Sequence, residues 1–369
     1  MNTIFKYLCV PALIILPASS IYAEGEDVKL QNEKSLTGPD NDYHGKNLFI
    51  TWTKDNNGGD APVKGAQITA QNITIETNFL DKYTNGRYRG ILNKGIYNTD
   101  NDRSNIIAPG TIKILTYDDG IYTESNAKAN INKFKNLNIT SKAGFGVVDN
   151  GGGINIEGGD NSVVTISSQS RPAIGNSMYT LFSHLGKEIT IKADKIVLNS
   201  KEYSIFSGQG DGKKFEVTLD AQNIGITGTI WGYNGDIFIT PSTKGEVNIS
   251  APAKREVSIS LSAGSKLTIN EDSAELKKTQ ITGKIEVDGK ETSLLANMTG
   301  DSFIAPRESS SSTVAIEASD GGNVNLNMSG ANSSITGDLK TGTGQKASIT
   351  ANLSGEGSHF TGNAEVIGD

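Results

Sequence analysis

The sequence predicts an all-β chain folded as a parallel β-helix, a solenoid in which short strands stack coil upon coil. Three observations lead to this prediction. A motif near the C-terminal end recurs at a fixed offset of 25 residues, which is typical of repeat architectures. Short apolar–polar–apolar triplets recur at a similar spacing through the middle of the chain. No stretch shows helical periodicity over three turns.

The repeat is clearest in residues 327–337 and 352–362. Superposed, Asn327 and Gly330 fall on Asn352 and Gly355, and the apolar Ile335 falls on Phe360. The first half of the motif recurs at residues 297–300 and the second half at 226–228 and 281–283. One loosely copied unit is therefore expected through at least the second half of the chain.

The triplets predict the strands of this unit, because alternating residues of a strand point to one face. The expected strands are centred on Thr74, Lys113, Asn138, Thr165, Thr190, Thr218 and Asn248, with steps of 25, 27, 25, 28 and 30 residues from the second triplet onward.

A second strand is expected between successive triplets, and it often follows a glycine. Its candidates are residues 95–97, 120–122, 146–148, 205–206 and 230–231. Polar corners rich in glycine, asparagine and aspartate separate the strands, since these residues accept turn conformations. Between residues 246 and 270 the triplets tighten to a ten-residue step, which fits either successive faces of one coil or a local hairpin.

The domain organisation follows from these patterns. Residues 1–23 have the features of a secretory signal peptide, with Lys6 before an apolar stretch too short to span a bilayer. Cleavage is expected between Ala23 and Glu24. Residues 24–65 are expected to form an N-terminal cap, because a solenoid end must be covered, and residues 66–369 to form the repeats. The only cysteine, Cys9, lies within the signal peptide.

Charge excludes one class of partner. The chain carries 34 Lys and Arg against 41 Asp and Glu, a net charge of −7. Nucleic acids need a basic binding surface, so no nucleic-acid partner is expected.

The signal peptide, the cysteine-free mature chain and the repeats at 297–300, 327–337 and 352–362 together resemble autotransporter passenger domains. The resemblance implies a right-handed parallel β-helix, type V secretion through the periplasm, and display at the outer membrane of a Gram-negative-type bacterium. Members of that family normally carry a C-terminal outer-membrane barrel, and no such segment follows the repeats. The expectation is therefore a fragment or truncated passenger, and the alternative is a protein exported by another route.

Few residues point to catalysis. The three histidines, His44, His184 and His359, lie outside protease-like contexts, and Gly300-Asp301-Ser302-Phe303 departs from Gly-Asp-Ser-Gly in its last residue. Polysaccharide-active β-helices use clustered acids with a basic residue. The candidates for such a cluster are Asp100, Asp102, Arg103, Asp118 and Asp119, all at expected turns, where aspartate is common for backbone reasons.

Binding sites are equally sparse. Residues 55–60 and 208–212 could hold calcium, but they lack the tandem copies of calcium-binding repeats. The aromatic residues fit either a glycan-binding stripe or stacking within the structure, which is favoured; they are Trp52, Tyr97, Tyr122, Trp231 and Tyr233. The sequence predicts no catalytic residue, no cofactor and no metal.

The function expected is therefore non-enzymatic: an adhesin or surface-interaction protein that rigidly displays binding loops to host or bacterial surface glycans or proteins. The loops expected to bind are residues 79–93, 170–187 and 301–312, the longest departures from the strand rhythm. One alternative is a carbohydrate-active enzyme, favoured by acids gathered with Arg or Lys in one cleft and opposed by acids scattered over corners. Another is a structural surface or biofilm component. The oligomeric state does not follow from the sequence.

Overall fold

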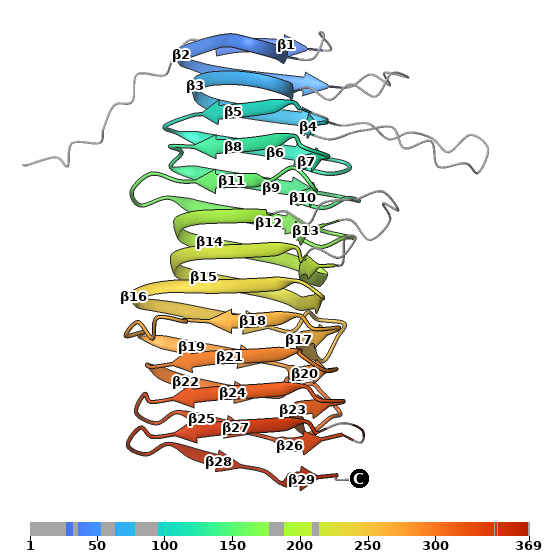
Figure 1. Cartoon of the computed structure of the whole chain (residues 1–369). Coiled ribbons are helices and arrows are strands. Elements are labelled where there is room, and N and C mark those ends of the chain that lie inside the picture. Colours follow the sequence, from blue (N-terminus) through green and yellow to red (C-terminus); the bar gives the residue numbers. More distant parts are fainter. Residues whose placement is uncertain are drawn as a thin grey trace, which may run out of the picture.

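The computed structural model describes residues 27–31, 36–52, 63–77, 95–99, 101–176, 188–208, 214–342, 344 and 346–367. These residues form 29 strands and no helix. Every strand pairing is parallel, and successive coils stack into a straight rod with β1 at one end and β29 at the other (Figure 1). The predicted parallel β-solenoid is confirmed. Among the described residues there is no helix that could span a membrane.

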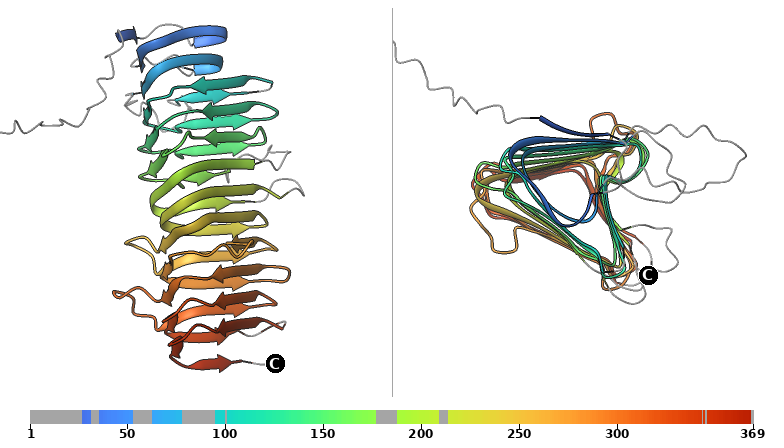
Figure 2. Two further views of the ribbon diagram at one scale, coloured as in Figure 1. Left: turned by 90° about the vertical axis from the view of Figure 1, so that its left-hand side faces the viewer. Right: turned by 90° about the horizontal axis from the view of Figure 1, so that it is seen from above.

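Each coil has three sides, and viewed along the axis the strands superpose on a triangle (Figure 2). We name the sides faces A, B and C in the order in which the chain visits them. Face A contains β4 (Ile96–Asn98), β7 (Ile121–Glu124), β10 (Val147–Asn150), β13 (Ile174–Gly175), β17 (Val257–Ser262), β20 (Lys284–Asp288), β23 (Val314–Ser319), β26 (Asp338–Thr341) and β29 (Ala364–Val366).

Face B contains β5 (Arg103–Ile107), β8 (Lys128–Asn132), β11 (Ile154–Glu157), β18 (Lys266–Ile269), β21 (Ser293–Met298), β24 (Asn323–Met328) and β27 (Ser348–Leu353). Face C contains β1 (Asp27–Gln31), β6 (Thr111–Thr116), β9 (Asn136–Ser141), β12 (Val163–Ser168), β19 (Lys278–Thr282), β22 (Asp301–Ala305), β25 (Ser334–Thr336) and β28 (His359–Thr361).

Five long strands bend around corners and contribute to more than one face. They are β2 (Leu36–Trp52), β3 (Val63–Thr77), β14 (Glu188–Ser207), β15 (Glu216–Tyr233) and β16 (Asp236–Ser250). Of the region expected to form a cap, β1 and β2 continue the same parallel register toward β3.

The core consists of inward side chains stacked in register from coil to coil. On face C one such ladder is Leu30, Ile50, Ile75, Ile114, Ile139, Ile166, Leu198, Ile226, Ile249, Ile281, Ile304, Ile335 and Phe360. The members from Ile50 to Ile335 are buried. Each is covered by the coil above and the coil below, so no coil can bury its apolar side chains alone.

The second half of the sequence motif forms the corner between faces C and A. Ile281 points into the core, Thr282 ends β19, and Gly283 alone connects β19 to β20. Gly283 has a φ of 120°, a conformation that residues with a Cβ rarely adopt. Gly337 joins β25 to β26 in the same way at φ 105°. The Ile-Thr-Gly triplet is therefore a one-residue corner.

The first half of the motif forms the corner between faces B and C. Asn352 donates a side-chain hydrogen bond to Asn327, and Asn327 donates one to Asn297, both at 2.8 Å. This amide ladder satisfies corner groups on three successive coils. A Cβ on Gly355 would lie 2.0 Å from the carbonyl oxygen of Gly330, so the backbones at this corner are too close for any side chain.

Two sequence expectations need correction, and one open alternative is resolved. Each coil has three strands, whereas two were expected; the strand missed lies on face B, except in the coils of β14 and β15, where it lies on face C. The triplets at Thr190 and Thr218 lie on face B, while the other triplets lie on face C. Residues 301–312 are not one loop, because Asp301–Ala305 is strand β22. The triplets spaced ten residues apart between residues 246 and 270 lie on successive faces of one coil, in β16, β17 and β18, and do not form a hairpin.

The stacked core predicts that substitutions at two neighbouring residues of β9 change the free energy of unfolding by very different amounts. Ile139→Ala removes a buried side chain between Ile114 and Ile166 and should lower the free energy of unfolding by about 2–5 kcal/mol. Asn138→Ala, at the exposed position next to it, should change it by about 0.5 kcal/mol or less. Denaturant unfolding monitored by circular dichroism measures both. Equal effects would contradict the stacked core.

Candidate functional site

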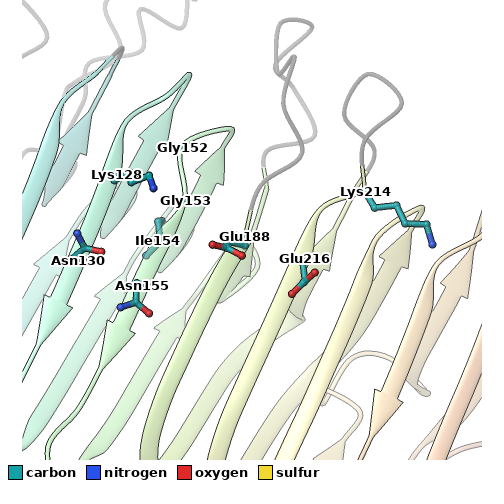
Figure 3. Close-up of a pocket in the computed structure, with 9 residues that line it drawn as sticks. All are labelled: Lys128, Asn130, Gly152, Gly153, Ile154, Asn155, Glu188, Lys214 and Glu216. Atoms are coloured by element: carbon teal, nitrogen blue, oxygen red, sulfur yellow. The ribbon is translucent and has the colours of Figure 1, made fainter. Parts of the chain in front are cut away.

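A shallow depression lies on the outer surface of face B, beside the corner with face A (Figure 3). Its volume is about 470 Å³. Residues from four successive coils line it, on or next to β8, β11, β14 and β15, so it is elongated along the rod axis. The lining residues are Lys128, Asn130, Gly152, Gly153, Ile154, Asn155, Glu188, Lys214 and Glu216.

The depression arises where a row of outward side chains is interrupted. The first residues of the face B strands stack in register, and Glu188 pairs with Glu216 in this row. Lys128 occupies the row on an earlier coil, and Gly153 falls between Lys128 and Glu188. Gly153 has no side chain, and a Cβ placed there would meet no atom within 4 Å. The missing side chain leaves the surface hollow at this point.

Several polar groups in the depression have no partner. Within the described residues, the side chains of Lys128, Asn130, Asn155 and Glu188 make no hydrogen bond or ion pair. Lys214 differs, because its ammonium lies 2.8 Å from Asp236 and 3.1 Å from the carbonyl oxygen of Gly264. The free amides and charges are therefore available to a ligand.

One buried carboxylate shapes the wall of the depression. Asp149 Oδ1 accepts hydrogen bonds from the backbone N–H groups of Gly152 at 2.7 Å and Gly153 at 2.9 Å, and from the Thr123 hydroxyl. Asp149 is fully buried, and its Oδ2 has no hydrogen-bond partner. Burial raises the pKa of this carboxyl above its ordinary value, although the hydrogen bonds to Oδ1 oppose the shift.

A second cluster of interest is aromatic and lies outside the core on face A. Tyr97 and Tyr122 are register partners with ring centroids 5.3 Å apart, and both hydroxyls donate to Glu124. Burial, reinforced by the Glu124 carboxylate, raises the pKa of Tyr122 above its ordinary value. Further along the face, Phe206 packs edge-on against Trp231 with centroids 4.9 Å apart.

The rings of this cluster cover one another. Tyr203 stacks on Trp231 at 5.0 Å, and the Arg255 guanidinium lies 4.2 Å from the centre of the Tyr203 ring. Three of the aromatic residues proposed for a glycan stripe, Tyr97, Tyr122 and Trp231, are thus engaged with neighbouring side chains. Tyr233 is 42% exposed, and the side chain of Trp52 lies outside the described residues.

The aspartates considered for catalysis stabilise corners. Asp102 accepts hydrogen bonds from the backbone N–H and hydroxyl of Thr99, and Asp119 accepts one from the backbone N–H of Phe145 at 2.8 Å. Asp119 is only 8% exposed. Asp100 lies outside the described residues. These contacts are the backbone role expected of aspartate at turns.

The serine and histidine candidates do not come together. Ser302 is buried, and its hydroxyl donates to the carbonyl oxygen of Gly300 at 2.6 Å. His44 lies in β2 near the N-terminal end of the rod and His359 in β28 at the opposite end (Figure 1). His184 lies outside the described residues.

Other predicted features fall where the structure gives no description. These are the cleavage point between Ala23 and Glu24, the possible calcium ligands at 55–60, most of 208–212, and the loops at 79–93 and 177–187. The described residues contain no group of three or more His, Cys, Asp or Glu side chains that could hold a metal ion.

Comparison with known protein families, with characterised proteins and with solved structures finds no match to this chain. The function must therefore be argued from the geometry and from the resemblance in the sequence.

Sequence reasoning missed the depression. Its residues lie on four face B strands, of which the sequence predicts those around Thr190 and Thr218 but not β8 or β11. On β8 the first inward residue, Ala129, is small and gives a weak pattern. For the three consecutive glycines at 151–153, the sequence predicts a corner but not a hollow in the surface.

The buried carboxyl predicts a pH dependence of stability. Because the folded-state pKa of Asp149 is raised, the folded chain binds a proton more tightly than the unfolded chain. Stability should therefore fall as pH rises from the ordinary aspartate value near 3.8 through the raised folded value. Asp149→Asn should remove this loss and flatten the melting temperature between pH 4 and pH 8.

Thermal unfolding across that pH range measures the effect. Asp160→Asn, at an exposed aspartate, is the control and should leave the profile unchanged. An Asp149→Asn variant whose profile stays parallel to that of the natural chain would contradict the assignment.

Proposed function

We propose that this chain is a secreted or surface-displayed solenoid that acts by binding, as an adhesin or surface-interaction protein, and not by catalysis. The observation that carries the proposal is the contrast between two sets of polar groups. At the corners, Asp102, Asp119 and Asp149 hold the backbone by accepting hydrogen bonds from N–H groups. In the depression of face B, four polar side chains have no partner among the described residues: Lys128, Asn130, Asn155 and Glu188.

The rod supports binding by display. Each coil is held by parallel hydrogen bonds and by the stacked core, so side chains on the outer faces keep fixed positions relative to one another. A ligand then meets groups that are already arranged, which lowers the ordering cost of binding. Candidate ligands are glycans or proteins on the surface of host cells or bacteria.

The cellular location in this proposal rests on the sequence. The signal peptide at residues 1–23 supports export to the periplasm, and the resemblance to autotransporter passengers supports display at the outer membrane. A passenger role also accords with the lack of cysteine after residue 23.

A second candidate function is that of a polysaccharide-active enzyme. One observation favours it: Glu188 and Glu216 are register neighbours in a depression that Lys128 and Lys214 also line. Acids gathered with basic groups in one cleft are the arrangement that such chemistry requires.

Export predicts a defined mature end. When the full chain is produced in a Gram-negative host, the exported protein should begin at Glu24, and Ala23→Arg should leave the precursor uncleaved, because signal peptidases need a small residue before the cut. Intact-mass measurement of the exported fraction checks this. An exported chain that still begins at Met1 would argue against the signal peptide.

Binding and catalysis are separated in one experiment. Fluorescently labelled chain should bind host or bacterial cells saturably and should leave plant and bacterial polysaccharides uncut. New reducing ends that disappear in both Glu188→Gln and Glu216→Gln would instead establish the enzyme. Concentration-dependent assembly without cell binding would favour a structural surface component.

A further inference from the structure

We infer that the depression of face B is a binding site for a neutral, linear glycan that lies along the rod axis, with its hydroxyl groups held by Asn130 and Asn155. This inference rests on the proposed binding function and names its ligand class and its site. The aromatic cluster of face A is not involved, because its rings cover one another.

The two amides are placed for such a ligand. Asn130 and Asn155 are direct register partners on β8 and β11. Asn105 precedes them in the row on β5, but its Oδ1 already accepts a hydrogen bond from Asn132 at 2.9 Å, so the free amides are Asn130 and Asn155. Neighbouring parallel strands are about 4.8 Å apart, so the row offers an amide at that interval along the axis. Each amide has an acceptor oxygen and two donor hydrogens, a combination that pairs with hydroxyl groups, which both donate and accept.

The hollow at Gly153 gives the ligand room. It lies in the adjoining row, between Lys128 and Glu188, and no atom would come within 4 Å of a Cβ at that position. A sugar ring seated there would reach both amides from one side. The ammonium of Lys128 and the carboxylate of Glu188, at either end of the hollow, can form further hydrogen bonds with the hydroxyl groups of the glycan.

The lining excludes other ligand classes. Lys214 is already paired with Asp236, and the other charged residues, Lys128, Glu188 and Glu216, are of mixed sign. The lining therefore has no surface of one charge to attract an anionic or a cationic polymer. The one large apolar residue, Ile154, is only 1% exposed. Protein and peptide partners are usually held by apolar or aromatic anchors, and the depression offers none. An uncharged ligand rich in hydroxyls fits best.

The test uses the full chain, fluorescently labelled, on an array of immobilised linear oligosaccharides that includes neutral, amino-sugar and acidic members. The natural chain should bind neutral members. The double variant Asn130→Ala with Asn155→Ala should bind them roughly tenfold more weakly or not at all, because two hydrogen-bonding side chains are lost.

The matched control is Asn138→Ala with Asn248→Ala. These residues are outward-facing strand asparagines on face C, away from the depression and the corners, and the change should leave glycan binding intact. Unchanged melting temperatures in both double variants show that the fold is retained.

Three results would overturn the inference. One is undiminished glycan binding by the Asn130 and Asn155 double variant. Another is binding to cells with no signal for any neutral glycan, and this result would leave the proposed display function standing. Loss of binding in the control double variant alone would move the site to face C and also contradict the inference.

Discussion

The structure depends on one constraint: an inward side chain of this rod is fully buried only when its counterparts on the coils before and after it cover it. Ile139 is covered by Ile114 and Ile166, and each of these in turn needs the next coil. The constraint fixes the register, because a slip by one residue would turn the buried set outward. It also explains why the chain repeats without being identical, since only the inward positions and the corners must match.

The corners and the outer faces follow from that stacking. At the corner between faces B and C, asparagines pair amide to amide across coils, and glycines let backbones approach closely. At the corner between faces C and A, single glycines turn the chain from one face to the next. Once the inside and the corners are fixed, the outward residues are free to vary. The depression of face B exists because one outward position, Gly153, is empty and its neighbours are polar.

Much of the fold could be predicted from the sequence because corresponding residues of successive repeats occupy equivalent positions on successive coils. Asn327 and Asn352 are register partners, as their 25-residue offset implied, and every expected second strand lies on face A. Other features could not be predicted. A triplet such as the one at Thr190 looks the same whether its strand lies on face B or face C, because both bury alternate residues. The depression brings together Lys128 and Glu188, which are separated by a corner and segments of variable length, so their shared row emerges only from the three-dimensional register.

The register itself is tested most directly by cross-linking. Residues 24–369 contain no cysteine, so introduced pairs can be read without background. Asn138 and Thr165 face outward as partners on β9 and β12, at a separation that a disulfide can bridge. Asn138→Cys with Thr165→Cys should form a disulfide rapidly under mild oxidation, whereas Asn138→Cys with Ser167→Cys, two residues out of register, should form it far more slowly. The reverse order, or equal rates, would contradict the stacked parallel register on which the whole account depends.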